Sequence, residues 1–291
     1  MNENIKQVSA VLNPPVPQMV GDGFRVHNFF PSGYKLQMSP FFLLDYNAKI
    51  QFSARNEPRG VGVHPHRGFE TVTIAYHGAV AHHDSAGNSG VIYPGGVQWM
   101  TAASGILHKE YHEEAFSKMG GAFQMVQLWV NLPAKDKMSK PKYQALSQAS
   151  IAKHELPDQS GLVEVIAGEY QGTKGTASTF TPMHVYHLRL HKDGKASFNF
   201  PADFNTAFMV IEGEIKVNNF SIAKADQLVY FKNEGEEIAV EGIQHSVVLI
   251  LSGAPIHEPI THYGPFLMNK PEEIQQAIAD YNQGRFGYLE E

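Results

Sequence analysis

The sequence predicts an all-β protein with two domains. Short runs of alternating or β-branched residues, such as 69–76 and 125–130, are separated by Gly, Pro, Asn and Asp, as is typical of a β-sandwich or β-barrel. The 26 glycines and 17 prolines are spread along the chain and indicate many turns. The chain has 291 residues and exceeds the roughly 100–200 residues of one domain. We therefore expect two domains, each with its own core.

A weak internal repeat supports two related domains. Residues 69–78 and 204–213 both begin with Phe-x-Thr, continue as a strand and end at Gly, with the same spacing. When these two segments are aligned, His64 corresponds to Asn199 and His66 to Pro201, all ahead of the repeated segments. The second copy therefore lacks the histidine pair. A chance likeness of two strand–turn units explains the pattern equally well, since all-β chains contain many such units.

The chain changes character after Pro133. Residues 133–160 are polar and irregular, and we interpret them as an interdomain connection with short helices. This predicts a first domain at 1–138 and a second at 139–291. A C-terminal helix is expected between Asn269 and Gly284, where apolar residues repeat at i, i+3, i+4 and i+7. These apolar residues are Ile274, Ala277, Ile278 and Tyr281.

Charge and composition exclude several classes of function. A formal net charge of −6 and a pI of about 6.2 argue against direct binding to nucleic acid, which requires clustered Lys and Arg. The N-terminus has no secretory signal pattern, and the longest apolar run, 246–254, reads as a buried strand rather than a membrane helix. We expect a cytoplasmic protein. With no cysteine, thiolate metal sites and cysteine nucleophiles are absent.

Histidine is the unusual feature of the composition. The chain has fifteen histidines, and seven of them lie in one sixth of its length: His64, His66, His77, His82, His83, His108 and His112. In an extended segment the imidazoles of His64 and His66 share one face. Those of His108 and His112 share a face with Glu110. Two neighbouring strands would thus bring nitrogen and oxygen ligands to one point, as suits a divalent first-row metal and iron-dependent oxygen chemistry.

Spacing alone leaves other interpretations open. A lone His-x-His is more often exposed or hydrogen-bonded than bound to metal. Glu70 lies at an even separation from His66 and competes with Glu110 as the carboxylate ligand. His82 and His83 point to opposite strand faces, so at most one faces the site, and the polar residues that follow favour a turn. His112 is a spare ligand or proton relay.

Five longer blocks of sequence carry a family pattern. They are 64–73, 94–102 and 105–110, with further support from 127–132 and 263–269. They resemble the pirin family of the cupin superfamily. The likeness extends over most of the chain and is strongest between residues 60 and 132. Together these blocks are far more specific than a His-x-His pair.

The resemblance implies two tandem cupin (jelly-roll) barrels with few short helices, the first holding Fe(II) and the second lacking metal ligands. It assigns the metal ligands as His64, His66, His108 and Glu110. The general cupin pattern would use Glu70 instead, but seven residues rather than six separate Glu70 from Gly78. We therefore expect Glu70 and His112 beside the ligands or as alternative ligands. Mn, Ni, Co, Cu and Zn also suit such a site, and no further cofactor is expected.

The family resemblance also implies an activity. Some members look like quercetin 2,3-dioxygenases, which open a flavonol with dioxygen and release carbon monoxide, with Glu110 here as a general base. Others look like redox-responsive regulators whose iron controls binding to a protein partner. A third hypothesis is a purely structural metal with a saturated coordination sphere.

Overall fold

The computed structural model describes residues 4–30 and 38–291. The chain divides into two compact units. We call Val16–Ser32, Phe41–Ala149 and Ile256–Glu291 the histidine unit, and Met1–Pro15, Gly33–Pro40 and Ser150–Pro255 the companion unit. Among the described residues, no helix is long and apolar enough to cross a membrane.

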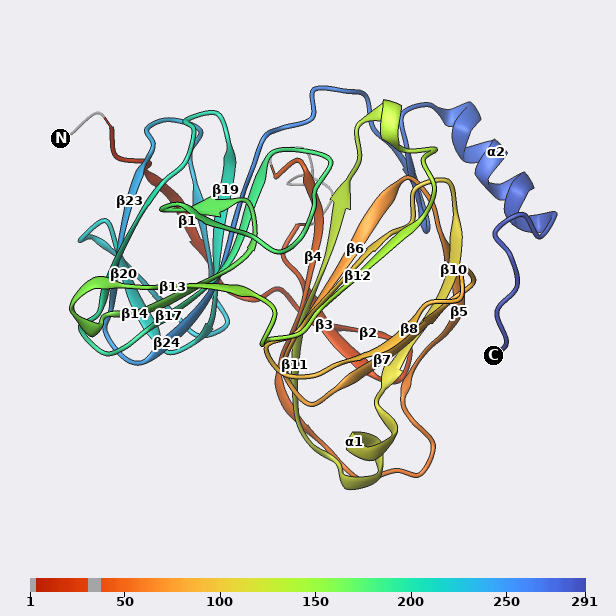
Figure 1. Cartoon of the computed structure of the whole chain (residues 1–291), viewed down its shortest axis with the longest axis horizontal. Coiled ribbons are helices and arrows are strands. Elements are labelled where there is room, and N and C mark those ends of the chain that lie inside the picture. Colours follow the sequence, from red (N-terminus) through yellow and green to blue (C-terminus); the bar gives the residue numbers. More distant parts are fainter. Residues whose placement is uncertain (1–3, 31–37) are drawn as a thin grey trace. The chain divides into compact units, whose positions relative to one another are not determined.

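The histidine unit is formed by a seven-stranded and a four-stranded sheet (Figure 1). The larger sheet has the order β12-β9-β6-β11-β4-β3-β2 and the smaller has the order β5-β10-β7-β8, all with antiparallel neighbours. The strands are β2 Gln18–Val20, β3 Phe24–Asn28, β4 Phe41–Phe52, β5 Gly60–His66, β6 Phe69–His77, β7 Val80–Asp84, β8 Ser89–Ile92, β9 Val97–Thr101, β10 Ile106–His112, β11 Gly121–Asn131 and β12 Lys142–Leu146. The remaining elements are α1 Glu114–Met119, a 3₁₀ turn at Ala134–Asp136, the hairpin β25 Thr261–Tyr263 and β26 Phe266–Met268, and α2 Pro271–Asn282.

The companion unit repeats this arrangement strand for strand. Its larger sheet has the order β1-β22-β19-β24-β17-β14-β13 and its smaller sheet the order β18-β23-β20-β21. These strands are β1 Val8–Leu12, β13 Ala152–Glu155, β14 Gly161–Ala167, β17 Met183–Leu190, β18 Lys195–Asn199, β19 Asn205–Glu212, β20 Glu214–Val217, β21 Ser221–Lys224, β22 Leu228–Phe231, β23 Glu237–Gly242 and β24 Ser246–Gly253. A short hairpin, β15 Glu169–Tyr170 and β16 Thr173–Lys174, and a 3₁₀ turn at Pro157–Gln159 complete the unit. The predicted all-β architecture of two related barrels is confirmed.

The two units are not continuous stretches of chain. Residues 4–15 belong to the companion unit, where β1 pairs with β22 and extends its larger sheet. Residues 256–291 belong to the histidine unit, where α2 packs through Ile274 and Ala277 against β26. The observed division therefore differs from the expected 1–138 and 139–291. The polar segment 133–160 contains two short 3₁₀ turns and also two strands, β12 and β13, which the sequence did not indicate.

The structure shifts the internal repeat by one residue at the histidine pair. His64 lies opposite His108, and Phe198 lies opposite Ile238, in corresponding pairs of strands. On β18 the buried positions are Ala196 and Phe198, and Phe198 is 4% exposed. Phe200, directly after the strand, continues the alternation and is 1% exposed. The distance to the Phe that begins the repeated segment is one residue longer in the companion unit, from Phe200 to Phe204 instead of from His66 to Phe69. A slip of one residue moves a side chain to the opposite face of a strand, so phenylalanines rather than Asn199 and Pro201 correspond to the histidine pair.

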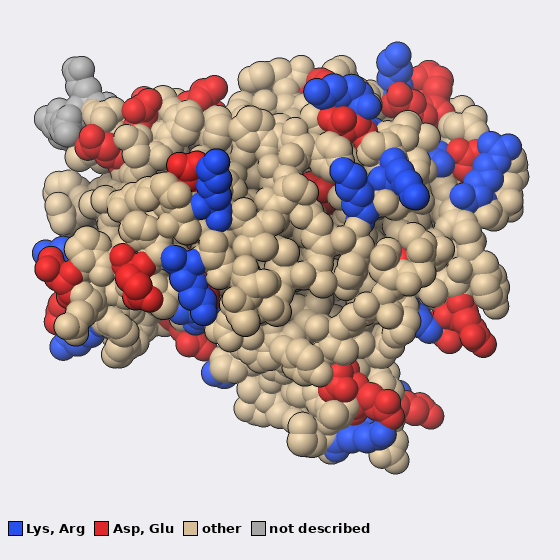
Figure 2. All heavy atoms as spheres, viewed as in Figure 1, with Lys and Arg blue, Asp and Glu red and all other residues tan. Residues whose placement is uncertain are grey.

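The charged residues of the protein are dispersed. Lys and Arg alternate with Asp and Glu over the face shown in Figure 2, without a large patch of one sign. On this face the distribution matches the mild net charge of −6. Electrostatic attraction of a polyanion requires a basic patch or stripe, and this face offers none.

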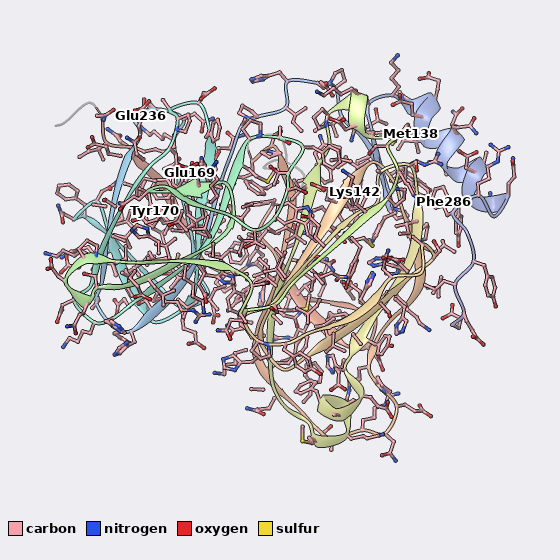
Figure 3. The ribbon with its side chains drawn as sticks, viewed as in Figure 1. Met138, Lys142, Glu169, Tyr170, Glu236 and Phe286 are labelled. Carbon is pink, nitrogen blue, oxygen red and sulfur yellow. The ribbon has the colours of Figure 1, made fainter. Side chains whose placement is uncertain are left out.

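A buried ion pair anchors the terminal helix within the histidine unit. Arg67 Nη1 lies 2.8 Å from Asp280 Oδ2, and both side chains are at most 9% exposed. Arg67 Nε also donates to the Ser104 carbonyl at 2.7 Å, and its guanidinium lies 4.6 Å from the Phe286 ring centroid. Phe286 is placed beyond α2 beside the loop that starts β10 (Figure 3). Arg67 directly follows His66, so these contacts hold the end of β5.

We predict that Asp280→Ala lowers the free energy of unfolding by about 2 kcal/mol, because it leaves a buried guanidinium without its charged partner. Urea denaturation followed by circular dichroism measures the effect. Glu114→Ala is the matched control, because its ion pair with Lys118 is solvent-exposed, and it should cause no measurable change. A loss below about 0.5 kcal/mol for Asp280→Ala, the range of ordinary surface substitutions, would contradict the anchoring role.

Candidate metal centre

Antiparallel pairing of β10 with two neighbours positions the candidate ligands. His108 lies opposite His64 of β5 on one side and opposite Asp84 of β7 on the other. Two residues further along β10, Glu110 lies opposite His82. Alternation on β10 keeps His108 and Glu110 on the buried face, at 0% and 4% exposure. The register therefore brings residues from three strands to one place.

Three histidines form a first group. Ligand atoms of His64, His66 and His108 all lie within 4.8 Å of one another. Their ring centroids are 4.3 to 4.8 Å apart. His66 and His108 are buried, and His64 is partly exposed. The structure thus brings together all three histidines that the sequence singled out as ligands.

A second group shares His108. Ligand atoms of His82, His108 and Glu110 also lie within 4.8 Å of one another. His82 Nδ1 is 3.4 Å from His108 Nδ1, and its Nε2 is 3.4 Å from Asp84 Oδ2. Among the described residues, both metal-capable groups lie in the histidine unit.

The expected turn at His82 and His83 is wrong. Both residues lie in β7, and the turn begins at Asp84, whose Oδ1 accepts hydrogen bonds from the backbone NH groups of Ala86 and Asn88. His82 is fully buried and faces the site, while His83 points the other way and contacts Tyr111. As alternation along a strand predicts, one of the two faces the site. The polar residues after Asp84 were the misleading signal.

Two polar side chains hold the Glu110 carboxylate. Thr73 Oγ1 donates to Glu110 Oε1 at 3.1 Å, and Gln127 Nε2 donates to Glu110 Oε2 at 2.7 Å. Gln127 Nε2 also lies 3.3 Å from Thr73 Oγ1. Thr73 lies opposite Gln127 in the pairing of β6 with β11. Sequence reasoning missed both residues, and only their polarity within otherwise apolar strands could have drawn attention to them.

The buried imidazoles fit a metal ion. His66 Nδ1 and His108 Nε2 are buried and have no hydrogen-bond partner among the described residues. Burial, and secondly the neighbouring histidines, lower the pKa of both side chains well below the usual value, so both are neutral and offer lone pairs. His64 Nδ1 donates to the Gly62 carbonyl at 2.8 Å and leaves Nε2 available. Nitrogen and carboxylate donors without sulfur suit a divalent first-row metal.

Glu70 and His112 lie outside both groups. Glu70 Oε1 accepts a hydrogen bond from Thr101 at 2.7 Å in the pairing of β6 with β9, and burial raises its pKa to about 7. His112 Nε2 donates to the Gly23 carbonyl at 2.9 Å. Its ring lies 4.6 Å from Phe52 and packs among further phenylalanines. Both side chains thus have structural contacts away from the two ligand groups.

Comparison with known proteins agrees with this geometry. Residues 23–130 match the family model for pirin, and residues 185–287 match the model for the pirin C-terminal cupin domain. A Pseudomonas aeruginosa protein named "Putative quercetin 2,3-dioxygenase" is 45% identical over 283 residues, which cover 97% of this chain and 99% of the relative. The chain belongs to the pirin family.

Further relatives of this pirin include plant proteins and solved structures. "Pirin-like protein 2" of Arabidopsis thaliana is 37% identical and covers 98% of this chain and 85% of its own length. A crystal structure of quercetin 2,3-dioxygenase from Acinetobacter baumannii is 44% identical with a TM-score of 0.92, covering 98% of this pirin and 100% of that chain. The similarity extends over both units.

We predict that His108→Ala lowers the affinity of this pirin for Fe(II) by at least about tenfold, because His108 belongs to both ligand groups. Anaerobic titration and elemental analysis of the loaded protein measure the effect. His245→Ala, at an exposed position of the companion unit, is the control and should retain full metal content. Metal retained by His64→Ala and lost in His82→Ala would show that the second group holds the ion.

Glu70→Gln should change how stability depends on pH. Because the folded pKa is raised to about 7 from 4.5, the folded state keeps this proton between those pH values while the unfolded state loses it. The contribution of Glu70 to stability therefore falls as pH rises through this window and stays low above it. In metal-free protein, the free energy of unfolding should fall between pH 4.5 and pH 8, and this fall should be smaller in the variant by on the order of 2 kcal/mol. The exposed control Glu155→Gln should leave the dependence of stability on pH unchanged. The same result for Glu70→Gln would refute the raised pKa of Glu70.

Proposed function

We propose that this pirin is an iron-dependent dioxygenase that opens quercetin-type flavonols. The observation that carries the proposal is the buried cluster of neutral imidazoles with unpartnered nitrogens, next to a carboxylate held by two hydrogen bonds. The relatives named as quercetin 2,3-dioxygenases, at 45% and 44% identity, support the substrate class. Fe(II) is the proposed metal because such nitrogen and oxygen sites suit iron and oxygen chemistry.

His64, His66, His108 and Glu110 are the proposed ligands. A metal held by these residues would supply Lewis-acid chemistry, which lowers the pKa of the flavonol hydroxyl and favours its electron-rich anion. The neutral state of His66 and His108, imposed by burial, keeps their lone pairs available. Gly62 fixes the tautomer of His64 through its carbonyl.

Glu110 is the proposed general base for the flavonol hydroxyl. Its two oxygens already accept hydrogen bonds from Thr73 and Gln127, so its orientation is set before substrate arrives. The proton would move from the substrate hydroxyl to a Glu110 oxygen. Thr73 and Gln127 are positioning residues in this scheme, because they act through Glu110.

An aromatic wall next to His66 is suited to a planar substrate. The His66 ring centroid lies 5.0 Å from Phe69 and 5.3 Å from Trp129. Phe69 and Trp129 are stacked with centroids 4.2 Å apart. Phe69 is fully buried, whereas Trp129 is partly buried. In our proposal this wall shields the site from water and orients the flavonol rings.

The activity is tested with iron-loaded protein under oxygen. Wild type should consume one dioxygen per quercetin and release one carbon monoxide, so that atoms balance between flavonol and ring-opened product. Glu110→Gln should lower kcat by on the order of 10²- to 10⁴-fold, the usual contribution of a general base, and His66→Ala should lose both metal and activity. Glu70→Ala, which removes a carboxylate outside both groups, should keep its metal. Flavonol left intact by the iron-loaded wild type would refute the proposal, and metal lost in Glu70→Ala but kept in Glu110→Ala would refute the ligand assignment.

Nitric oxide titration separates this proposal from the other two predicted roles. An open coordination position gives a spectral change when nitric oxide binds the Fe(II) form. A structural metal with a saturated site gives none. A redox-responsive regulator would show a protein partner that binds in only one iron state, without turnover of flavonol.

A further inference from the structure

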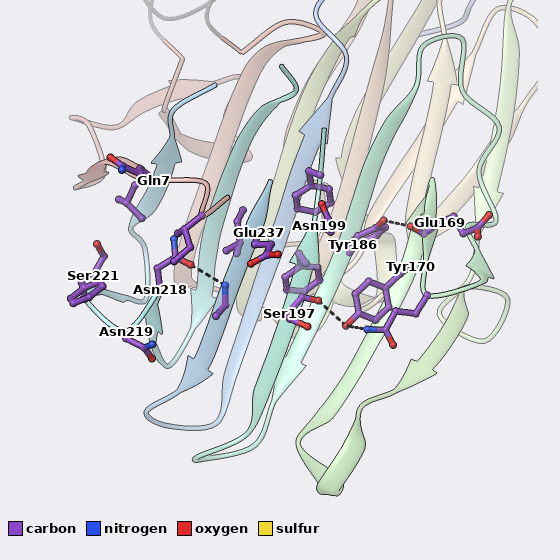
Figure 4. Close-up of a pocket in the computed structure, with 18 residues that line it drawn as sticks. Gln7, Glu169, Tyr170, Tyr186, Ser197, Asn199, Asn218, Asn219, Ser221 and Glu237 are labelled. Atoms are coloured by element: carbon purple, nitrogen blue, oxygen red, sulfur yellow. Dashed lines mark hydrogen bonds between the residues drawn. The ribbon is translucent and has the colours of Figure 1, made fainter. Parts of the chain in front are cut away.

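The companion unit contains a large cavity of its own. It has a volume of about 930 Å³, within the range of roughly 300–1,000 Å³ found for small-molecule sites. All of its lining residues belong to the companion unit, and they come from β18, β23, β15 and the β20–β21 turn, among others (Figure 4). It is therefore separate from the candidate metal centre.

The cavity lies at the companion unit's equivalent of the metal-binding strands. Three of its lining residues, Phe198, Phe200 and Ile238, occupy the positions that correspond to His64, His66 and His108. Side chains that cannot bind a metal have replaced all three histidines. These three side chains are at most 4% exposed and pack in the core of the unit. The cavity is also lined by the exposed residues that alternate with them, among them Asn199 and Glu237.

Aromatic rings form the buried wall of the cavity. Phe198 and Phe200 have nearly parallel rings, with centroids 5.9 Å apart and an interplanar angle of 9°. Tyr170 and Tyr186 pack on Phe198 with centroids 5.3 and 6.2 Å away. All four of these side chains are at most 5% exposed. Such a wall favours flat, apolar ring systems through contact area and stacking.

Hydrogen bonds to the backbone fix the two tyrosines. Tyr186 OH donates to the Glu169 carbonyl at 2.6 Å, and Tyr170 OH donates to the Ser197 carbonyl at 3.2 Å (Figure 4). Burial raises the pKa of both phenols, so they are neutral at physiological pH. The rings are therefore held in place before any ligand binds, which lowers the entropic cost of binding.

The charged residues at the cavity are acidic. Glu169 and Glu237 line it together with Asn199 and Asn219, and all four are exposed. No Lys, Arg or His occurs among its described lining residues. Lys195 and Lys216 line a smaller neighbouring cavity of about 380 Å³, and Lys216 is paired with Glu241 at 2.7 Å. The carboxylates at the rim thus attract a cation and repel an anion.

We propose that this cavity is a second ligand site, for a planar aromatic cation of two or three fused rings. The aromatic wall would hold the ring system, and the carboxylates of Glu169 and Glu237 would face the positive charge. Electron-rich phenol and benzyl faces also attract cations. The site would bind its ligand without metal and without the flavonol chemistry proposed for the histidine unit.

Three naphthalene probes of matched size test the proposal by isothermal titration calorimetry on the full chain. 2-Naphthylmethylammonium should bind at least about tenfold more tightly than 2-naphthoate, with neutral 2-naphthol between them, as expected for two nearby carboxylates at a partly exposed rim. The double variant Glu169→Gln/Glu237→Gln should reduce this ratio to about threefold or less. Glu155→Gln, an exposed acidic position of the companion unit that lines neither cavity, is its control.

Two further variants locate the site. Asn199→Trp places a large side chain at the cavity and should weaken binding of the cation at least about tenfold, while Ala149→Trp, at an exposed turn of the histidine unit, should not. Circular dichroism and the melting temperature confirm that each variant folds. His108→Ala should leave the affinity unchanged, so this outcome is independent of the proposed dioxygenase. Absence of binding up to about 1 mM of the cation, equal binding of 2-naphthoate, or full affinity in Asn199→Trp would each overturn the proposal.

Discussion

The register of β10 against β5 and β7 is the constraint on which the metal centre depends. It sets His108 opposite His64 and Glu110 opposite His82. A slip of one residue would turn His108 and Glu110 away from the buried face together. The apolar residues at the core end of these strands oppose such a slip, because Ile106 shares the buried face with His108 and is 1% exposed. The site is therefore held by the packing of the sheet as much as by its own contacts.

Burying imidazole nitrogens without hydrogen-bond partners lowers the stability of the fold, and other contacts must offset this loss. His66 Nδ1 and His108 Nε2 lose their water and gain no hydrogen bond from the described residues. Stabilising contacts lie nearby: Arg67, next to His66, is bound to Asp280 and Ser104, and Lys137 donates to the carbonyls of Gly68 and Leu267 at 2.7 and 2.8 Å. The C-terminal segment thus supports the strand that carries the histidine pair. A bound metal ion would give these two nitrogens a partner in place of the lost water.

The two units have the same architecture but different side chains in their interiors. Their sheets have the same strand order, yet one contains a histidine cluster and the other an aromatic core with a cavity beside it. The fold therefore determines where a site lies, and the few inward positions of two strands determine its chemistry. Replacing imidazoles by phenylalanines removes the candidate ligand nitrogens without disturbing the strand pairing, since both side chains fit the buried face of a strand.

The residues alone predicted the all-β class, two domains, the C-terminal helix and strand faces that could bring His64, His66 and His108 to one point. These features depend on local periodicity, and alternation along a strand is visible in the sequence. The relation between the two domains and the ligand set came from the family resemblance. Glu110 could be chosen over Glu70 only through family resemblance. The register of β7 against β10 brings His82 to His108 and Glu110. Thr73 and Gln127 belong to the other sheet of the unit, and only the packing of the two sheets brings them to Glu110. The tertiary structure likewise decided that phenylalanines replace the histidine pair in the companion unit, because one additional residue ahead of the repeated segment reverses which side chains face inward.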